Sequence, residues 1–296
     1  MNGSFARYHP VVQFLFFFSV MLIAMTISEP VCLIISFLPA LTYMIFLGGR
    51  RALTTVFKYI LPMFLFIGVM NPLFNHGGMT IIGYLPSGNP FTLESLLYGI
   101  AAGLMFSTIL LWCACLRRIM TSDRVIYLFG KAAPRLSLLI SMILRFIPRI
   151  ADYTRQLRAA QKCIGRDMTD GNLITRFRNT VRIISCLIQW VLENSIDTAD
   201  ELKSKGYGLP HRTSFSLFDF TLRDGVLCGF ILLCDAVVGW GMMSGAAEFY
   251  YFPVVSEITG GTVQIVLYAF YLLLCIMPIM LEAEEGIRWH YIRSGM

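Results

Sequence analysis

Asn194, Asp197, Asp200 and Glu201 lie close together in a segment with helical character, and their oxygen atoms could hold a divalent cation. Membrane-embedded prenyl-transfer enzymes hold Mg²⁺ and a diphosphate with paired clusters of this kind. Two clusters must face each other for that chemistry, and the sequence offers one. Pairing with Arg and Lys on adjacent helical turns explains these residues better. A Mg²⁺-dependent prenyl-transfer enzyme stays open as an alternative function.

Other residue types that often carry chemistry are scattered. Gly130-Lys131 lacks the GxxxxGK[ST] frame of a phosphate-binding loop, so any ATP must be bound by another chain. The eight cysteines include no CxxC or Cys/His spacing typical of metal sites, and the four histidines are isolated in sequence. We therefore expect no catalytic residue, no metal and no cofactor in this chain.

Two carboxylates lie in or near apolar segments, where charge is costly and often functional. Glu94 is only two residues into its segment, which suits a position at the membrane interface. Asp235 is deeper, so we expect it to hydrogen-bond a neighbouring helix or to face a partner protein.

The composition defines the setting of these residues. The chain has 296 residues, of which 56% are hydrophobic and 14% are charged, and its mean hydropathy is +0.67. Soluble domains have about 45–50% apolar and about 25% charged residues. This excludes a soluble enzyme, a disordered chain and a disulfide-rich secreted module, and it predicts a multi-pass membrane protein.

Six apolar segments are long enough, or nearly so, to cross a bilayer core of about 30 Å as helices. They are residues 11–27, 30–47, 53–74, 93–116, 225–247 and 262–281. The predicted fold class is therefore all-α, with about six transmembrane helices.

The basic residues predict the orientation, because Lys and Arg are retained in cytoplasmic loops. Loops 28–29, 75–92 and 248–261 contain no Lys or Arg, so we place them outside. Both termini are then cytoplasmic, in the plasma membrane of a prokaryote.

The sequence divides into a four-span bundle (1–116), a cytoplasmic or interfacial domain (117–222) and two C-terminal spans (223–296). The middle domain holds 17 of the 24 basic and 9 of the 18 acidic residues, a net charge of +8. Its apolar stretches suit amphipathic helices that lie at the membrane interface, with Lys and Arg reaching water. This domain is predicted to form a platform of long helices.

Three helices are predicted within the platform, over about 121–130, 134–163 and 172–205. Pro134 suits a helix start, whereas Pro148 should kink the second helix. Gly165 and Gly206 follow the second and third helices, as expected of C-terminal glycines, and cations precede each of them. Two similar helix ends on one cytoplasmic face would suit two similar partners.

Three stretches carry a resemblance to a known family. Residues 144–165 (LRFIPRIADYTRQLRAAQKCIG) and 199–208 (ADELKSKGYG) resemble the two coupling motifs, AQ-x-ARG and ARGYG, of the transmembrane coupling component of energy-coupling factor (ECF) transporters. Residues 71–99 are similar to the loop between the third and fourth spans of that family. With the span pattern, the resemblance covers nearly all of the chain up to about residue 222.

The resemblance implies a scaffold subunit of an ABC-type importer for vitamins or metal ions, without enzymatic activity of its own. Its implied partners are two cytoplasmic ABC-type ATPases, which hydrolyse ATP, and a small substrate-binding membrane subunit in the same bilayer, with no nucleic acid. The residues implied to contact the ATPases are Cys163, Ile164, Gly165, Arg166, Ser204, Lys205 and Gly206. The residues implied to support the coupling helices are Arg145, Pro148, Arg158, Gln161, Asp200, Glu201, Tyr207 and Gly208.

The two motifs depart from the family pattern at its arginine. Ile164 occupies that position in the first motif and Lys205 in the second. Lys keeps the charge but not the planar, bidentate guanidinium. This inequality predicts two different ATPase polypeptides. A self-sufficient permease, with its own substrate site in the spans, stays open as a second alternative.

Overall fold

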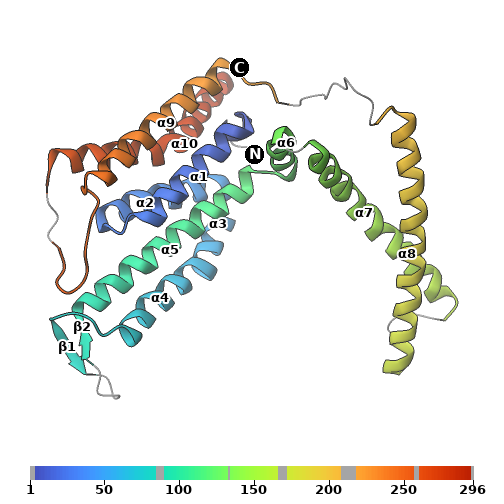
Figure 1. The fold of residues 1–296 in the computed structure, drawn as a ribbon, viewed down its shortest axis with the longest axis horizontal. Helices are drawn as coiled ribbons and strands as arrows, with labels where there is room; N and C mark the ends of the chain where they lie inside the picture. The colour runs from blue at the N-terminus through green and yellow to red at the C-terminus, as the bar shows by residue number, and fades with distance from the viewer. Residues whose placement is uncertain are drawn as a thin grey trace. The chain divides into compact units, whose positions relative to one another are not determined.

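The computed structural model describes residues 4–84, 90–132, 134–165, 172–207, 218–256 and 260–294. The chain divides into two compact units, Met1–Val125 with Phe218–Met296, and Ile126–Leu217. The elements in chain order are η1 (Ser4–Arg7), α1 (Pro10–Thr26), α2 (Pro30–Gly48), α3 (Arg50–Thr55), η2 (Val56–Ile60), α4 (Leu61–Phe74), β1 (Ile81–Tyr84), β2 (Pro90–Thr92), α5 (Leu93–Ile119), α6 (Ser122–Ala132), α7 (Pro134–Cys163), α8 (Leu173–Ser204), α9 (Leu222–Met243) and α10 (Thr262–Ser294), as labelled in Figure 1.

The helical prediction is confirmed. Within the described residues, five stretches are long and apolar enough to cross a membrane, and α1 is a shorter apolar helix of 17 residues. The five stretches are Pro30–Gly48, Ala52–Phe74, Leu93–Ile119, Leu222–Met243 and Thr262–Glu284. The fifth predicted span begins at Leu222 rather than at residue 225, because Thr221 and Asp224 form a capping box there.

Small residues let α4 and α5 approach closely. A Cβ atom added at Gly99 would lie 2.8 Å from the backbone oxygen of Gly68, and one at Gly103 would lie 3.0 Å from that of Phe64. Gly99 and Gly103 have the G-x-x-x-G spacing that brings membrane helices together. The absence of side chains at these positions therefore decides how α4 packs on α5.

The core of the first unit centres on Trp112 of α5. The rings of Phe16 and Phe17 on α1 meet it edge-on, at centroid distances of 5.7 and 6.1 Å. Its indole nitrogen donates to Ser36 Oγ on α2 over 3.2 Å. Because a buried indole N–H needs an acceptor, this hydrogen bond fixes the position of the Trp112 ring together with the packing of its aromatic neighbours.

The two notable carboxylates are both hydrogen-bonded. Asp235 on α9 accepts from Ser19 on α1, so the expectation that it bonds a neighbouring helix is confirmed. Glu94, in the first turn of α5, accepts from the backbone N and the Oγ1 of Thr80, over 3.1 and 2.8 Å. It thereby holds the end of a loop that continues into the antiparallel β1–β2 hairpin, an element that the sequence did not predict.

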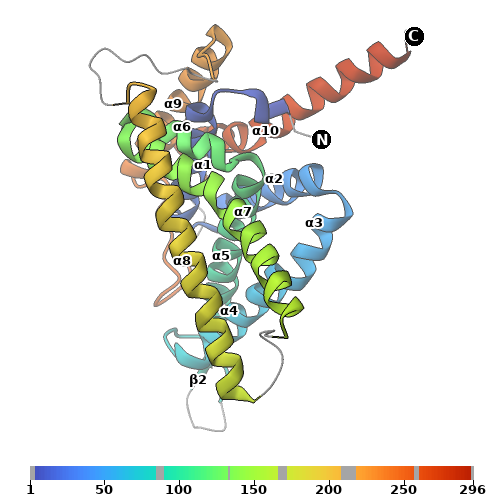
Figure 2. The same cartoon turned by 90° about the vertical axis from the view of Figure 1, so that its right-hand side faces the viewer.

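The second unit contains α7 and α8, with most of α6 (Figure 2). The predicted helices 121–130, 134–163 and 172–205 match α6, α7 and α8 to within about two residues. Pro134 begins α7 as predicted, and α7 continues through Pro148 as one helix to Cys163. The second unit therefore presents two long helices, whose ends carry the predicted contact residues.

Candidate coupling surface

The end of α8 is closed by a Schellman motif. Gly206 has a φ of +75°, a conformation that favours glycine. Its backbone N–H donates to the Lys203 carbonyl over 3.0 Å, and the N–H of Tyr207 donates to the Leu202 carbonyl over 2.9 Å. These two bonds satisfy carbonyls that the helix leaves open, so the chain turns sharply at Lys205 and Gly206.

The end of α7 turns in a similar way. Gly165 has a φ of +71°, and its N–H donates to the Lys162 carbonyl over 3.0 Å. Ile164, just before it, is 60% exposed, and Cys163 is also exposed. The prediction that both glycines terminate helices is confirmed, and α7 presents an apolar side chain where α8 presents Lys205.

The helices α7 and α8 are joined by stacked aromatic rings around Trp190 of α8. Tyr153 of α7 stacks on it at a centroid distance of 4.2 Å and 11° between planes, and Phe146 stacks at 5.8 Å and 15°. The guanidinium of Arg149 lies over the same indole at 5.7 Å. Because Phe146, Arg149 and Tyr153 follow one face of α7, a single indole holds two turns of that helix.

The two helix ends lie at different ends of this pair. α7 ends near the beginning of α8, whereas the end of α8 lies far from the end of α7, as Figures 1 and 2 show. At 1.5 Å per residue, Gly165 lies about 18 Å beyond Tyr153, and Gly206 lies about 24 Å beyond Trp190. The geometry is that of two rigid arms that meet at Trp190 and carry similar turns at separate points.

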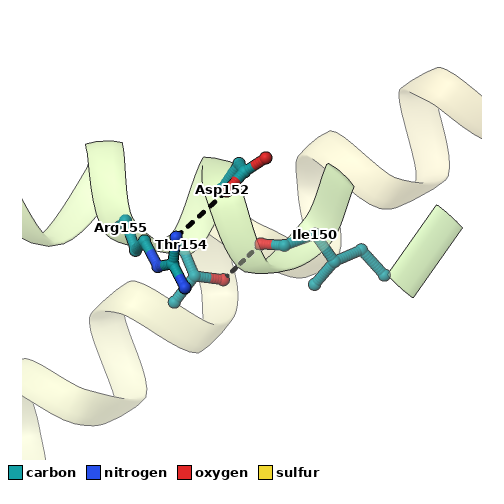
Figure 3. A network of polar contacts seen from close by, with 4 residues as sticks. All are labelled: Ile150, Asp152, Thr154 and Arg155. Carbon is teal, nitrogen blue, oxygen red and sulfur yellow. Dashed lines mark hydrogen bonds and ion pairs between the residues drawn. The ribbon is translucent and has the colours of Figure 1, made fainter. Parts of the chain in front are cut away.

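The supporting residues predicted on α7 are spread along the helix. Arg145, Pro148 and Arg158 are exposed, and Gln161 is half-buried two residues before the last residue of the helix. The polar side chains in the middle of α7 make their contacts within the helix: Arg155 pairs with Asp152 at 3.4 Å, and Thr154 Oγ1 donates to the Ile150 carbonyl over 2.7 Å (Figure 3). Exposed pairs of this type stabilise a helix by only about 0.3–0.5 kcal/mol.

Of the acidic residues predicted near the end of α8, Asp200 makes its side-chain contact within the helix itself. Asp200 pairs with Lys203 at 3.7 Å, as expected of acids beside basic residues on adjacent turns. The carbonyl of Glu201 accepts from the Lys205 N–H and from Ser204 Oγ, over 3.1 and 2.8 Å. Asn194, Asp197 and Glu201 remain on the same long helix, one to three turns before its end. Of the predicted contact and support residues, Arg166 and Gly208 lie outside the described residues.

An exposed apolar stripe follows α8. Phe177, Val181, Ile184, Ile188 and Leu192 recur at helical spacing, and each is between 44% and 72% exposed. The middle of α7 exposes a second set at similar spacing, and this set comprises Leu139, Ile140, Ile143, Leu144 and Ile147. The predicted apolar stretches are therefore largely uncovered in the chain alone, whereas Ile183 is buried. Such surfaces mark contact with membrane or protein.

The aromatic joint at Trp190 is the part of this surface that the sequence analysis missed. The signal was available in the spacing of Phe146, Arg149 and Tyr153, which share one face of a helix. The partner of that face could not be read from spacing, because Trp190 belongs to another helix.

Comparison with known proteins identifies the family. The family model CbiQ, described as cobalt transport protein, matches residues 2–215, which is more than half of the chain. The chain belongs to the CbiQ family. With its apolar helices, this CbiQ-family chain is a multi-pass membrane protein of a transporter family.

Curated relatives have names that agree with this family. The energy-coupling factor transporter transmembrane protein EcfT of Lactobacillus helveticus is 34% identical over 108 residues, 36% of this chain and 39% of that protein. EcfT of Brevibacillus brevis is 30% identical over 106 residues, with 36% and 40% covered. EcfT 1 of Listeria monocytogenes is 29% identical over 195 residues, with 61% and 72% covered. This chain matches about two fifths of the length of the Lactobacillus helveticus and Brevibacillus brevis proteins. These names describe transporter components, which fits a chain that is not an enzyme.

Proposed function

We propose that this chain is the transmembrane scaffold of an energy-coupling factor importer. Two cytoplasmic ABC-type ATPases bind the ends of α7 and α8, and a small membrane subunit binds the substrate, a vitamin or a metal ion. The observation that carries the proposal is the pair of glycine turns at Gly165 and Gly206, on separate arms of one helix pair. Two separate but similar ends match two ATPase subunits, and the names of the curated relatives support the same role.

The proposed mechanism is mechanical. The two ATPases approach each other as they bind ATP and move the turns at Gly165 and Gly206. The arms transmit this movement because a long helix is stiff and because stacked rings fix their crossing at Trp190. The exposed apolar stripes of α7 and α8 then shift the substrate-binding subunit in the membrane. Coupling of this kind needs an element with two discrete arrangements, which the crossed pair would supply.

The ATPases are proposed to be different polypeptides. The residue before the glycine differs between the two helix ends: Ile164 at the end of α7 is apolar and exposed, whereas Lys205 at the end of α8 is cationic. A groove lined by carboxylates accommodates Lys205, whereas Ile164 needs an apolar groove. Native mass spectrometry of the purified complex is expected to give one copy of each of two ATPases. Two copies of one ATPase would contradict this proposal.

Co-purification tests the scaffold role. A tagged chain extracted from its native membrane is expected to bring two ATPases and a small membrane protein with it. The same chain reconstituted alone in proteoliposomes is expected to transport nothing. Uptake by the chain alone would establish a self-sufficient permease, and Mg²⁺-dependent prenyl transfer would establish an enzyme; either result overturns the proposal.

Charge reversal at one helix end tests the contact residues. Lys205→Glu is expected to reduce ATPase association and substrate uptake while membrane insertion is unchanged, because a carboxylate repels an acidic groove. Arg155→Glu is the matched control, since Arg155 is an exposed cation on α7 remote from both helix ends. Equal effects of the two variants, or unaffected uptake in Lys205→Glu, would refute the assignment of the second motif.

The proposed orientation has both termini and the second unit on the cytoplasmic side of the plasma membrane. The absence of Lys and Arg from loops 28–29, 75–92 and 248–261 supports this topology. Single cysteines at residues 82 and 250 are expected to react with a membrane-impermeant maleimide in intact cells, whereas Cys163 is expected to react only after lysis. The reverse pattern would invert the topology.

A further inference from the structure

The chain passes between the two units twice, once near Val125 and once near Phe218. The first crossing is held by Arg124 of α6. Its Nη1 donates to the side-chain oxygen of Gln13 over 3.1 Å and to the carbonyl of Ile119 over 2.6 Å. One guanidinium thus joins the beginning of α6 to the end of α5 and to α1.

Gln13 is itself fixed by buried hydrogen bonds. Gln13 is fully buried, and its Nε2 donates to the carbonyls of Phe5 and Tyr8 over 2.8 and 2.9 Å. Both N–H groups of the amide are therefore used, and its oxygen accepts from Arg124. Because a buried amide must have its bonds satisfied, the side chain has little freedom to turn away from Arg124.

The second crossing is held by the same segment of chain. The backbone N–H of His9 donates to Asp224 Oδ1 over 2.9 Å, in a buried contact. Asp224 Oδ2 accepts from the N–H and the hydroxyl of Thr221 over 2.9 and 2.6 Å. The imidazole of His9 packs edge-on against Phe220 at 5.2 Å. The beginning of α9 and the two residues before it are thus tied to the residue that caps α1.

Residues 5–13, which we call the clasp, therefore bind both crossings to one helix of the membrane bundle. The hydrogen bonds join residues separated by 111 and 215 positions in sequence. Capping of α9 requires only Thr221 and Asp224, and capping of α1 requires only the His9 ring. The bonds from Gln13 to Arg124 and from His9 to Asp224 go beyond capping, because they tie the beginning of α1 to the first turns of α6 and α9, next to the two crossings.

We propose that the clasp transmits movement of the second unit to the membrane helices. Each covalent link between the units leaves the first unit next to residues that the clasp holds, Arg124 at one link and Phe220 with Asp224 at the other, so a displacement of the second unit is passed on to α1. Without the clasp, the same displacement would be absorbed by rotation of the chain near residues 121–125 and 218–222. Gln13, Arg124 and Asp224 are positioning residues in this proposal, which rests on the proposed function.

The test uses the whole complex, with both ATPases and the substrate-binding subunit, in proteoliposomes. Substrate uptake and ATP hydrolysis are measured together for Arg124→Met and Gln13→Asn. Gln13→Asn is the milder variant, since it shortens the side chain by one methylene and keeps an amide. Arg117→Met is the control, because it removes an exposed arginine at the end of α5 from the same side of the bundle. Arg124→Lys tests whether a smaller cation at this position retains part of the uptake per ATP.

We expect complexes of normal subunit composition that still hydrolyse ATP, with uptake per ATP reduced about fivefold or more, a typical range for coupling between sites. Arg124→Lys should lie between Arg124→Met and the parent chain. The double variant should be no worse than the poorer single variant, because both remove one interaction. Uptake per ATP equal to that of Arg117→Met, in variants that assemble, would overturn the clasp. Absence of ATP-driven uptake in the parent complex would instead refute the proposed function.

Discussion

Gly165→Ala tests whether the turn at the end of α7 depends on a glycine conformation. A Cβ atom added at Gly165 would meet no atom of the described residues within 4 Å, so steric contact with that part of the chain adds nothing to the cost. The cost comes from the φ of +71°, which an L-residue adopts at about 1–2 kcal/mol. Ala also restricts the competing open conformations of the chain, which offsets about 0.4–1 kcal/mol. The net cost is about 1 kcal/mol, which corresponds to about fivefold in an equilibrium constant.

The assay is the affinity of the ATPases for the chain in nanodiscs. Gly165→Ala is expected to weaken binding about fivefold if the ATPase recognises the turned conformation. Gly165→Asn is the matched control, since Asn adopts this left-handed conformation more readily despite its larger side chain. The expected order of affinity is therefore Gly, then Asn, then Ala.

The reverse order would refute the reasoning. If Asn binds more weakly than Ala, side-chain size in the ATPase groove decides affinity, and the backbone conformation does not. Equal affinity for the parent chain and both variants would mean that the turn at Gly165 is outside the contact, and it would remove α7 from the proposed pair of coupling sites.

Three further predictions concern individual contacts. Trp190→Leu should lower the free energy of unfolding of the helix pair by about 2 kcal/mol, because two stacks and one cation–π contact are lost. Trp190→Phe should retain part of this stabilisation. Equal thermal midpoints for the two variants would argue against the stacked contact at Trp190. Burial raises the pKa of Tyr251 to about 12, so its phenol stabilises the fold fully below pH ~10 and loses this effect as the pH rises through about 12. Thermal midpoints in detergent should thus fall more steeply above pH ~10 in the parent chain than in Tyr251→Phe; parallel curves would contradict this. Glu94→Ala should make loop 75–92 more sensitive to protease because Thr80 loses its acceptor, whereas Glu94→Gln, which keeps one oxygen, should change it less.

Several features of the fold could be predicted because their causes are local. The apolar segments follow from hydropathy alone, since a bilayer of fixed thickness requires about 20 apolar residues in a row. The ends of α7 and α8 follow from Gly165 and Gly206, because few other residues adopt a positive φ at a helix end. The basic platform is likewise readable, because positive charge is retained on one side of a membrane.

Boundaries were less predictable where a side chain outside the apolar run decides them. The fifth span begins at Leu222, before its continuous apolar run, because Asp224 and Thr221 cap each other. The β1–β2 hairpin was missed because its strands are only four and three residues long and have no alternating pattern. Loop 75–80 is also fixed from outside, since Glu94 and Ser95 accept from and donate to its backbone.

The sequence by itself determined that this is a membrane protein with a basic helical platform and two glycine-ended helices. Hydropathy, charge asymmetry and helix capping each act over one helix or less, so they can be read from consecutive residues. Only the tertiary structure decided that Trp190 joins the two arms and that Gln13 reaches Arg124 across 111 positions. Those contacts depend on which faces of separate helices meet. That choice is made by packing of the whole bundle, which no single segment specifies.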